Sequence, residues 1–121
     1  MVRGGLGFSA YQPVLFFMKG EAKIRNQIKD VREISTSSQK CAERDHPYQK
    51  DGLFVADVIT CCTSENDAVL DPFLGSGTTM IACENLGRKC RGAEVDPGYV
   101  AVCLERYKTT FNKMPVLLEG D

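Results

Sequence analysis

A carboxylate, a glycine turn and a pair of threonines occur together between residues 69 and 79, in the order V-L-D-P-F-L-G-S-G-T-T. An apolar run ends at Asp71, and an amphipathic segment begins at the threonines. This order predicts a short buried strand, a tight loop and the start of a helix. Glycines let backbone N–H groups approach a ligand closely, and a helix N-terminus favours polar or anionic groups.

Dinucleotides, nucleoside triphosphates and S-adenosylmethionine are all bound by such turns. The triphosphate loop requires a lysine before its Ser/Thr, and residues 75–79 contain none. The dinucleotide fingerprint G-x-G-x-x-G fits in part, because Gly75 and Gly77 are present but Met80 replaces the third glycine. Glu94, nineteen residues after Gly75, can accept hydrogen bonds from ribose hydroxyls. In an S-adenosylmethionine site Glu94 would still accept these ribose hydroxyl bonds, and no pyrophosphate has to be bound. The pattern therefore favours a methyl-donor site.

Alternating apolar segments and turn residues predict the elements around this loop. They are a helix over 52–63, a buried strand over 68–71, a helix over 78–86 stopped by Gly87, a strand over 89–95 and a helix from Pro97 to about residue 112 with Asp96 as N-cap. The order strand–helix–strand–helix favours a parallel sheet and the α/β class. We also predict a flexible N-terminus over 1–10, a buried strand over 11–19, and a last strand or ordered tail over 114–118.

Length and charge restrict the broad class. The 121 residues suffice for one domain or part of one, and the net charge of -1 with a pI of about 5.8 shows no global basic field. Residues 19–50 carry eight basic and five acidic side chains, which fit either a solvated face or contacts with phosphates. No apolar run reaches the ~20 residues of a membrane span.

The six cysteines show no C-x-x-C spacing, and the chain has a single histidine. We therefore expect neither a metal site nor a disulfide framework. Apolar surroundings predict buried free thiols at Cys61, Cys62, Cys83 and Cys103. Free thiols imply a reducing, cytoplasmic setting.

Four segments resemble, in the same order, motifs of the amino-methylating DNA methyltransferases, which modify adenine or cytosine. They are Y-Q-P-V-L-F-F-M-K-G at 11–20, H-P-Y-Q-K at 46–50, D-P-F-L-G-S-G-T-T at 71–79 and R-G-A-E-V-D-P-G-Y at 91–99. The resemblance implies a Rossmann-like, S-adenosylmethionine-dependent methyltransferase fold. The motif order resembles the C-terminal half of the family's β-type arrangement. Residues 11–121 would then be a partial methyltransferase domain, with an outer strand and cofactor-side loop over 11–51 and a cofactor-binding βαβα unit over 52–121.

The resemblance also implies roles for individual residues. Glu94 would hold the ribose hydroxyls, Asp71 would face the methionine moiety or order the loop, and Phe73 would line the pocket. The residues of the glycine turn would let the backbone approach the cofactor closely, and the two threonines would begin the helix. A further group of residues would reach the cofactor from the opposite side. The complete set of expected cofactor-binding residues is Asp71, Phe73, Gly75, Ser76, Gly77, Thr78, Thr79, Glu94, His46, Gln49 and Lys50.

The family's catalytic motif, [DNS]-P-P-[YFW], does not occur in this sequence, so no catalytic residue is predicted. The nearest string, D-H-P-Y at 45–48, belongs to the H-P-x-Q-K element by its position. By the resemblance, the strand over 68–71 would lack a neighbour on one edge, which is a template for a partner. The expected partners are DNA, with adenine favoured over cytosine, and a second polypeptide carrying the catalytic motif. The competing interpretation is a non-catalytic fragment for cofactor binding or subunit interaction.

Overall fold

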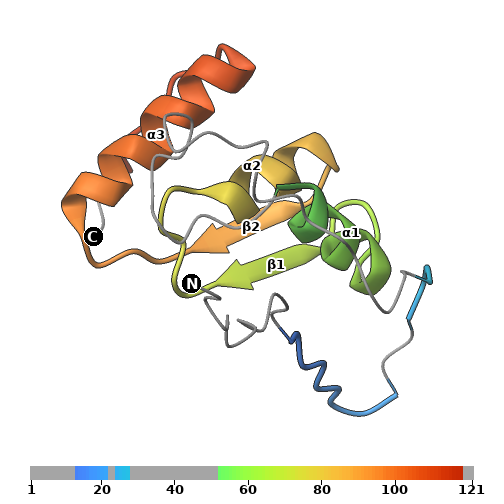
Figure 1. The fold of residues 1–121 in the computed structure, drawn as a ribbon. Helices are drawn as coiled ribbons and strands as arrows, with labels where there is room; N and C mark the ends of the chain where they lie inside the picture. Colours follow the sequence, from blue (N-terminus) through green and yellow to red (C-terminus); the bar gives the residue numbers. More distant parts are fainter. Residues whose placement is uncertain (1–12, 22–23, 28–51, 119–121) are drawn as a thin grey trace, which may run out of the picture.

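The structure, a computed structural model, describes residues 13–21, 24–27 and 52–118 (Figure 1). Its elements are α1 (Gly52–Cys62), β1 (Ala68–Asp71), α2 (Thr78–Asn85), β2 (Lys89–Gly92) and α3 (Pro97–Phe111). The strands pair in parallel, with Ala68 opposite Lys89 and Asp71 opposite Gly92. This arrangement confirms the predicted α/β class, and each helix starts where the sequence predicts.

A small core lies between the first two helices and the sheet. Val55 and Ile59 of α1 pack against Ala82 and Cys83 of α2, and side chains from both strands pack below them. Only alternate residues of β1 face this core, because successive strand side chains point to opposite faces. Leu70 lies on the other face and is 74% exposed, so the prediction that β1 is buried was wrong.

The ends of the elements have local causes. Asp96 accepts a hydrogen bond from the Gly98 backbone N–H at 2.7 Å, which confirms the predicted N-cap of α3. The second strand ends at Gly92 and is therefore shorter than the predicted strand over 89–95. A side chain at position 92 would meet Leu74 at 2.7 Å, so the loop after β1 packs directly on the end of β2.

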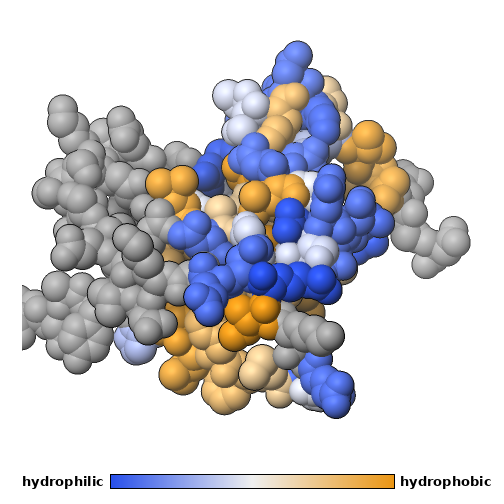
Figure 2. All heavy atoms as spheres, turned by 90° about the vertical axis from the view of Figure 1, so that its right-hand side faces the viewer, coloured by the Kyte–Doolittle hydropathy of each residue, from blue (hydrophilic) through white to orange (hydrophobic). Residues whose placement is uncertain are grey.

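Two predicted apolar elements do not form strands. Residues 13–19 are neither helix nor strand, and the side chains from Val14 to Met18 are exposed, Phe17 by 89%. Figure 2 shows hydrophobic side chains protruding at the lower edge of the molecule, where Figure 1 places this segment. Residues 114–118 are likewise exposed and outside any strand, which excludes the first of the two predicted alternatives, a last strand, and agrees with the second, a tail. A strand needs a neighbour for its backbone groups, and within the described ranges the sheet contains only β1 and β2.

The cysteines follow the prediction with one exception. Cys61, Cys83 and Cys103 are buried free thiols, whereas Cys62 is exposed, which corrects its predicted burial. Consecutive helical residues point in different directions, so Cys61 can face the core while Cys62 faces outward. None of the helices in the described part of the chain is long and apolar enough to cross a membrane.

Candidate functional site

Two carboxylates stand at the carboxyl ends of the paired strands. Asp71 is the last residue of β1, and Glu94 follows the end of β2 by two residues. The parallel register brings these ends together, and the loop after β1 is bonded to the chain after β2. Leu74 N–H donates to the Ala93 carbonyl at 2.9 Å, and Ala93 N–H donates to the Asp71 carbonyl at 3.0 Å. In parallel sheets, ligands bind beyond this edge.

The Glu94 carboxylate is held by backbone N–H groups. Its Oε1 accepts from Asp96 N–H at 2.9 Å, and its Oε2 accepts from Gly75 N–H at 2.7 Å. The hydrogen bond from Asp96, followed by that from Gly75, holds the pKa of Glu94 below its usual value. The side chain therefore stays an acceptor-only carboxylate at neutral pH, and a carboxylate has about four lone-pair sites, which leaves capacity for further donors.

The Asp71 carboxylate organises the loop that follows it. Its Oδ1 accepts from Phe73 N–H at 3.0 Å, and its Oδ2 accepts from the Thr79 hydroxyl at 2.6 Å. These bonds tie the end of β1 to the first turn of α2. Of the two roles expected for Asp71, the geometry supports ordering of the loop.

The two glycines of the turn have different structural roles. Both have a positive φ, 56° at Gly75 and 85° at Gly77, which side chains rarely adopt. A Cβ at Gly75 would meet no atom of the described residues within 4 Å, so none of them blocks the approach of a ligand there. A Cβ at Gly77 would lie 2.6 Å from the Cys103 sulfur. Gly77 is therefore required for the close packing of α3 against the loop.

Ser76, between the two glycines, is only 5% exposed. Its carbonyl oxygen and its hydroxyl both accept hydrogen bonds from Nη1 of Arg106 on α3, at 2.5 and 3.0 Å. Its backbone N–H has no acceptor among the described residues. Arg106 was not predicted as a site residue. The available signal was its position, one helical turn after the buried Cys103 and thus on the same face of α3.

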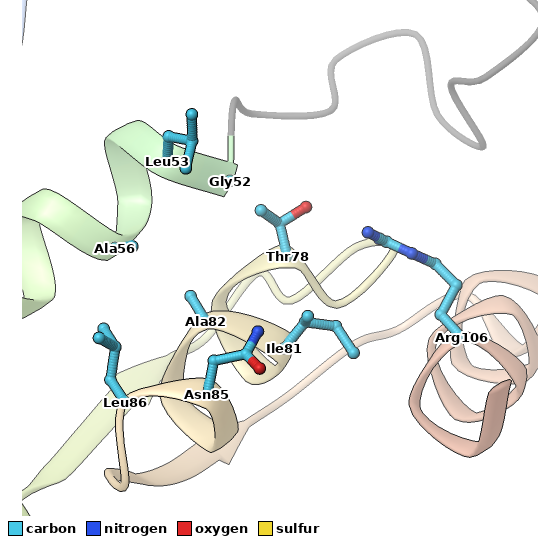
Figure 3. Close-up of a pocket in the computed structure, with 9 residues that line it drawn as sticks. All are labelled: Gly52, Leu53, Ala56, Thr78, Ile81, Ala82, Asn85, Leu86 and Arg106. Carbon is cyan, nitrogen blue, oxygen red and sulfur yellow. The ribbon is translucent and has the colours of Figure 1, made fainter. Parts of the chain in front are cut away.

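The side chains of other predicted residues have different surroundings. Phe73 is 86% exposed on the loop. Thr78 lines a separate hollow of about 430 Å³ between α1 and α2, with Arg106 at its rim (Figure 3). Neither Asp71 nor Glu94 lines this hollow. The predicted residues His46, Gln49 and Lys50 lie outside the described residues.

The structure thus brings together Asp71, Gly75, Ser76, Thr79 and Glu94. This group offers anionic acceptors, and among the described residues it also has a backbone donor without an acceptor and a glycine position that no side chain fills. Within the described ranges, no cluster of three or more metal-binding side chains occurs. The arrangement suits an organic ligand that carries hydroxyl groups and a positive charge.

A model of the DNA methylase family, N6/N4 type, matches residues 9–105. The chain belongs to the N6/N4 DNA methylase family. The Type II methyltransferase M2.LlaDCHI of Lactococcus lactis subsp. cremoris is 39% identical over 82 residues, which cover 66% of this chain and 30% of that protein. The Type II methyltransferase M2.DpnII of Streptococcus pneumoniae is 35% identical over the same length and with the same shares.

A solved structure is also similar to this DNA methylase chain. The M1.HpyAVI–SAM complex is 36% identical, with a TM-score of 0.60, and the match covers 74% of this chain and 46% of that one. These findings confirm the predicted family and the partial S-adenosylmethionine-dependent methyltransferase fold. The chain spans less than a third of the length of the two Type II methyltransferases.

Proposed function

We propose that this chain is the S-adenosylmethionine-binding half of a DNA methyltransferase that modifies the exocyclic amino group of adenine. The observation that carries the proposal is the Glu94 carboxylate, fixed by two backbone N–H groups beside the glycine turn. The related M1.HpyAVI structure, described as a SAM complex, supports the choice of cofactor.

The residues at the strand ends fit this cofactor. An ionised carboxylate at Glu94 matches the hydroxyl donors of a ribose, and the Ser76 N–H matches an acceptor on the ligand. Asp71 and Glu94 place negative charge next to a site that would hold a cationic sulfonium. The cofactor, when bound, supplies the methyl group carried on that sulfonium. We assign His46, Gln49 and Lys50 to the opposite side of the ligand, on the strength of the motif alone.

The complete enzyme requires a base-holding element that this sequence lacks. The motif [DNS]-P-P-[YFW] is absent, so we propose that a second polypeptide supplies it. In the described part of the chain β1 pairs with β2 alone, and its other edge is a template for a partner strand. We further propose that basic residues in 19–50 contact DNA phosphates and that the complex acts in the cytoplasm.

Cofactor binding is tested by isothermal titration calorimetry of the whole chain with S-adenosylmethionine. The unmodified chain binds, and Glu94→Ala weakens binding by about tenfold or more, because a charged acceptor is lost. The control is Glu105→Ala on α3, whose side chain is 67% exposed and bridges to Lys108. Equal affinities for the two variants, or no binding by the unmodified chain, would contradict the proposal.

Catalysis is tested by transfer of tritium from labelled S-adenosylmethionine to DNA. The chain alone transfers none, and transfer appears when a polypeptide bearing the catalytic motif is added. Transfer by the chain alone would overturn the half-enzyme proposal. Binding without transfer in any combination would favour the competing interpretation, a non-catalytic cofactor-binding fragment, because the missing motif already points that way.

A further inference from the structure

Helix α3 contacts the back of the glycine turn through side chains one helical turn apart. Cys103 fills the space that a side chain at Gly77 would need, and Arg106 donates from one guanidinium nitrogen to the carbonyl and hydroxyl oxygens of Ser76. Both Cys103 and Ser76 are buried. The turn that carries the candidate site is therefore braced by an element that contributes no carboxylate to it.

Each residue of the turn has a separate restraint. Gly75 N–H donates to Glu94, and Gly77 N–H donates to the Leu74 carbonyl at 3.0 Å. Arg106 restrains the residue between them by holding two of its three hydrogen-bonding groups. The remaining group, the Ser76 N–H, has no acceptor within the described ranges. The direction of that donor depends on how firmly Arg106 holds the rest of the residue.

We infer that Arg106 is a positioning residue for the cofactor: it fixes Ser76 so that the turn is preorganised before the ligand arrives. This inference rests on the proposed function. A guanidinium suits the task because its charge strengthens both hydrogen bonds and the two N–H groups of Nη1 lie in the fixed guanidinium plane. A lysine ammonium would offer a point charge without that geometry. Preorganisation lowers the ordering cost that binding otherwise carries.

A purely structural arginine elsewhere in the chain provides a matched control. Arg88 donates to the Thr63 hydroxyl and carbonyl and to the Leu86 carbonyl, at the opposite end of the strands from the carboxylates. Replacing either arginine by methionine removes a guanidinium that bonds backbone oxygens and keeps an unbranched side chain. Arg106→Met and Arg88→Met are therefore comparable in chemistry and differ in location.

The first measurement needs no cofactor. Amide hydrogen exchange of the ligand-free chain reports the turn through the Gly77 N–H, which the Leu74 carbonyl protects. We expect faster exchange at Gly77 in Arg106→Met and unchanged exchange there in Arg88→Met. Unchanged exchange at Gly77 in Arg106→Met would overturn the positioning role, whatever ligand the site takes.

The second measurement is the affinity for S-adenosylmethionine by calorimetry, at a temperature where each variant is folded by circular dichroism. We expect about tenfold weaker binding for Arg106→Met, wild-type affinity for Arg88→Met, and partial recovery for Arg106→Lys, which keeps the charge. Equal losses in both methionine variants would overturn the inference, because affinity would then follow stability. Absence of binding by the unmodified chain would instead contradict the proposed function. The hydrogen-exchange measurement would still test whether Arg106 positions the turn. If Arg106→Met fails to fold, Arg106→Lys and Ser76→Ala take its place in the comparison with Arg88→Met.

Discussion

The carboxyl edge of the strands and the apolar segment over residues 14–18 differ in how their groups find partners. At the strand edge, Asp71 bonds Phe73 and Thr79, and Glu94 bonds Asp96, all within eight residues in the sequence. Longer-range bonds, from Gly75 to Glu94 and from Arg106 to Ser76, add to these. The apolar segment has no polar groups in its side chains and remains exposed. Short-range hydrogen bonds thus supply much of the loop order, whereas burial of an apolar strand depends entirely on surfaces from distant parts of a fold.

The largest expected effect is the difference in stability loss between replacing a buried and replacing an exposed apolar side chain. Ile59 is 5% exposed in the core, and Phe17 is 89% exposed in the apolar segment. Ile59→Ala should lower the free energy of unfolding by about 3 kcal/mol, from lost burial and a new cavity. Phe17→Ala should change it by less than about 0.5 kcal/mol, as for a surface position. Urea unfolding followed by circular dichroism measures both. Similar losses would show that residues 14–18 are buried in solution.

The next comparison uses two glycines that both have a positive φ. Gly77 in the turn has φ of 85°, and Gly20 after the apolar segment has φ of 71°. Gly77→Ala adds a clash with the Cys103 sulfur to the backbone strain, so we expect a loss of about 2–3 kcal/mol. Gly20→Ala would meet no atom of the described part of the chain within 4 Å, and strain alone should cost about 1 kcal/mol.

Unfolding free energies of the two variants check this contrast, and calorimetry with S-adenosylmethionine sharpens it. Gly77→Ala should also weaken binding, because the turn must shift away from α3, whereas Gly20→Ala should bind as the unmodified chain does. Equal stability losses would mean that Cys103 moves aside freely, which would remove the packing requirement at Gly77.

The sequence predicted the strand-edge region well because its signals are local. An apolar run ending in Asp71, a glycine turn and the Asp96-Pro97 pair each determine the backbone around them. These signals placed β1, α2 and the start of α3 correctly. They also placed Glu94 beside the turn, since its position after the second strand follows from the parallel pairing.

The sequence predicted the apolar segment over residues 14–18 poorly, because a strand depends on a neighbouring strand for its backbone hydrogen bonds. Residues 14–18 have the composition of a buried strand, yet the described residues provide no neighbour for them. Arg106 was missed for a related reason. Its hydrogen bonds to Ser76 join residues that are 30 positions apart in the sequence. They can be predicted only once the packing of α3 against the turn is known.

The smallest expected effect concerns two carboxylates with different kinds of partner. Backbone hydrogen bonds from Asp96 and then Gly75 lower the pKa of Glu94, whereas a hydrogen bond from the Lys113 ammonium is the main cause that lowers the pKa of Glu84 on α2. A carboxylate whose pKa is lower in the folded state stabilises the fold above its unfolded pKa of about 4.3. That contribution is lost as the pH falls through the folded pKa.

Both Glu94→Gln and Glu84→Gln should therefore flatten the loss of stability between about pH 5 and pH 3, measured as unfolding free energies in urea. Salt distinguishes them. The Glu84–Lys113 pair is exposed, so about 0.5 M NaCl should screen it and reduce the difference between Glu84→Gln and the unmodified chain. The effect of Glu94→Gln should persist, because its partners are uncharged N–H groups. Loss of the Glu94 effect in salt would mean that nearby charges, rather than the glycine turn, hold this carboxylate in place.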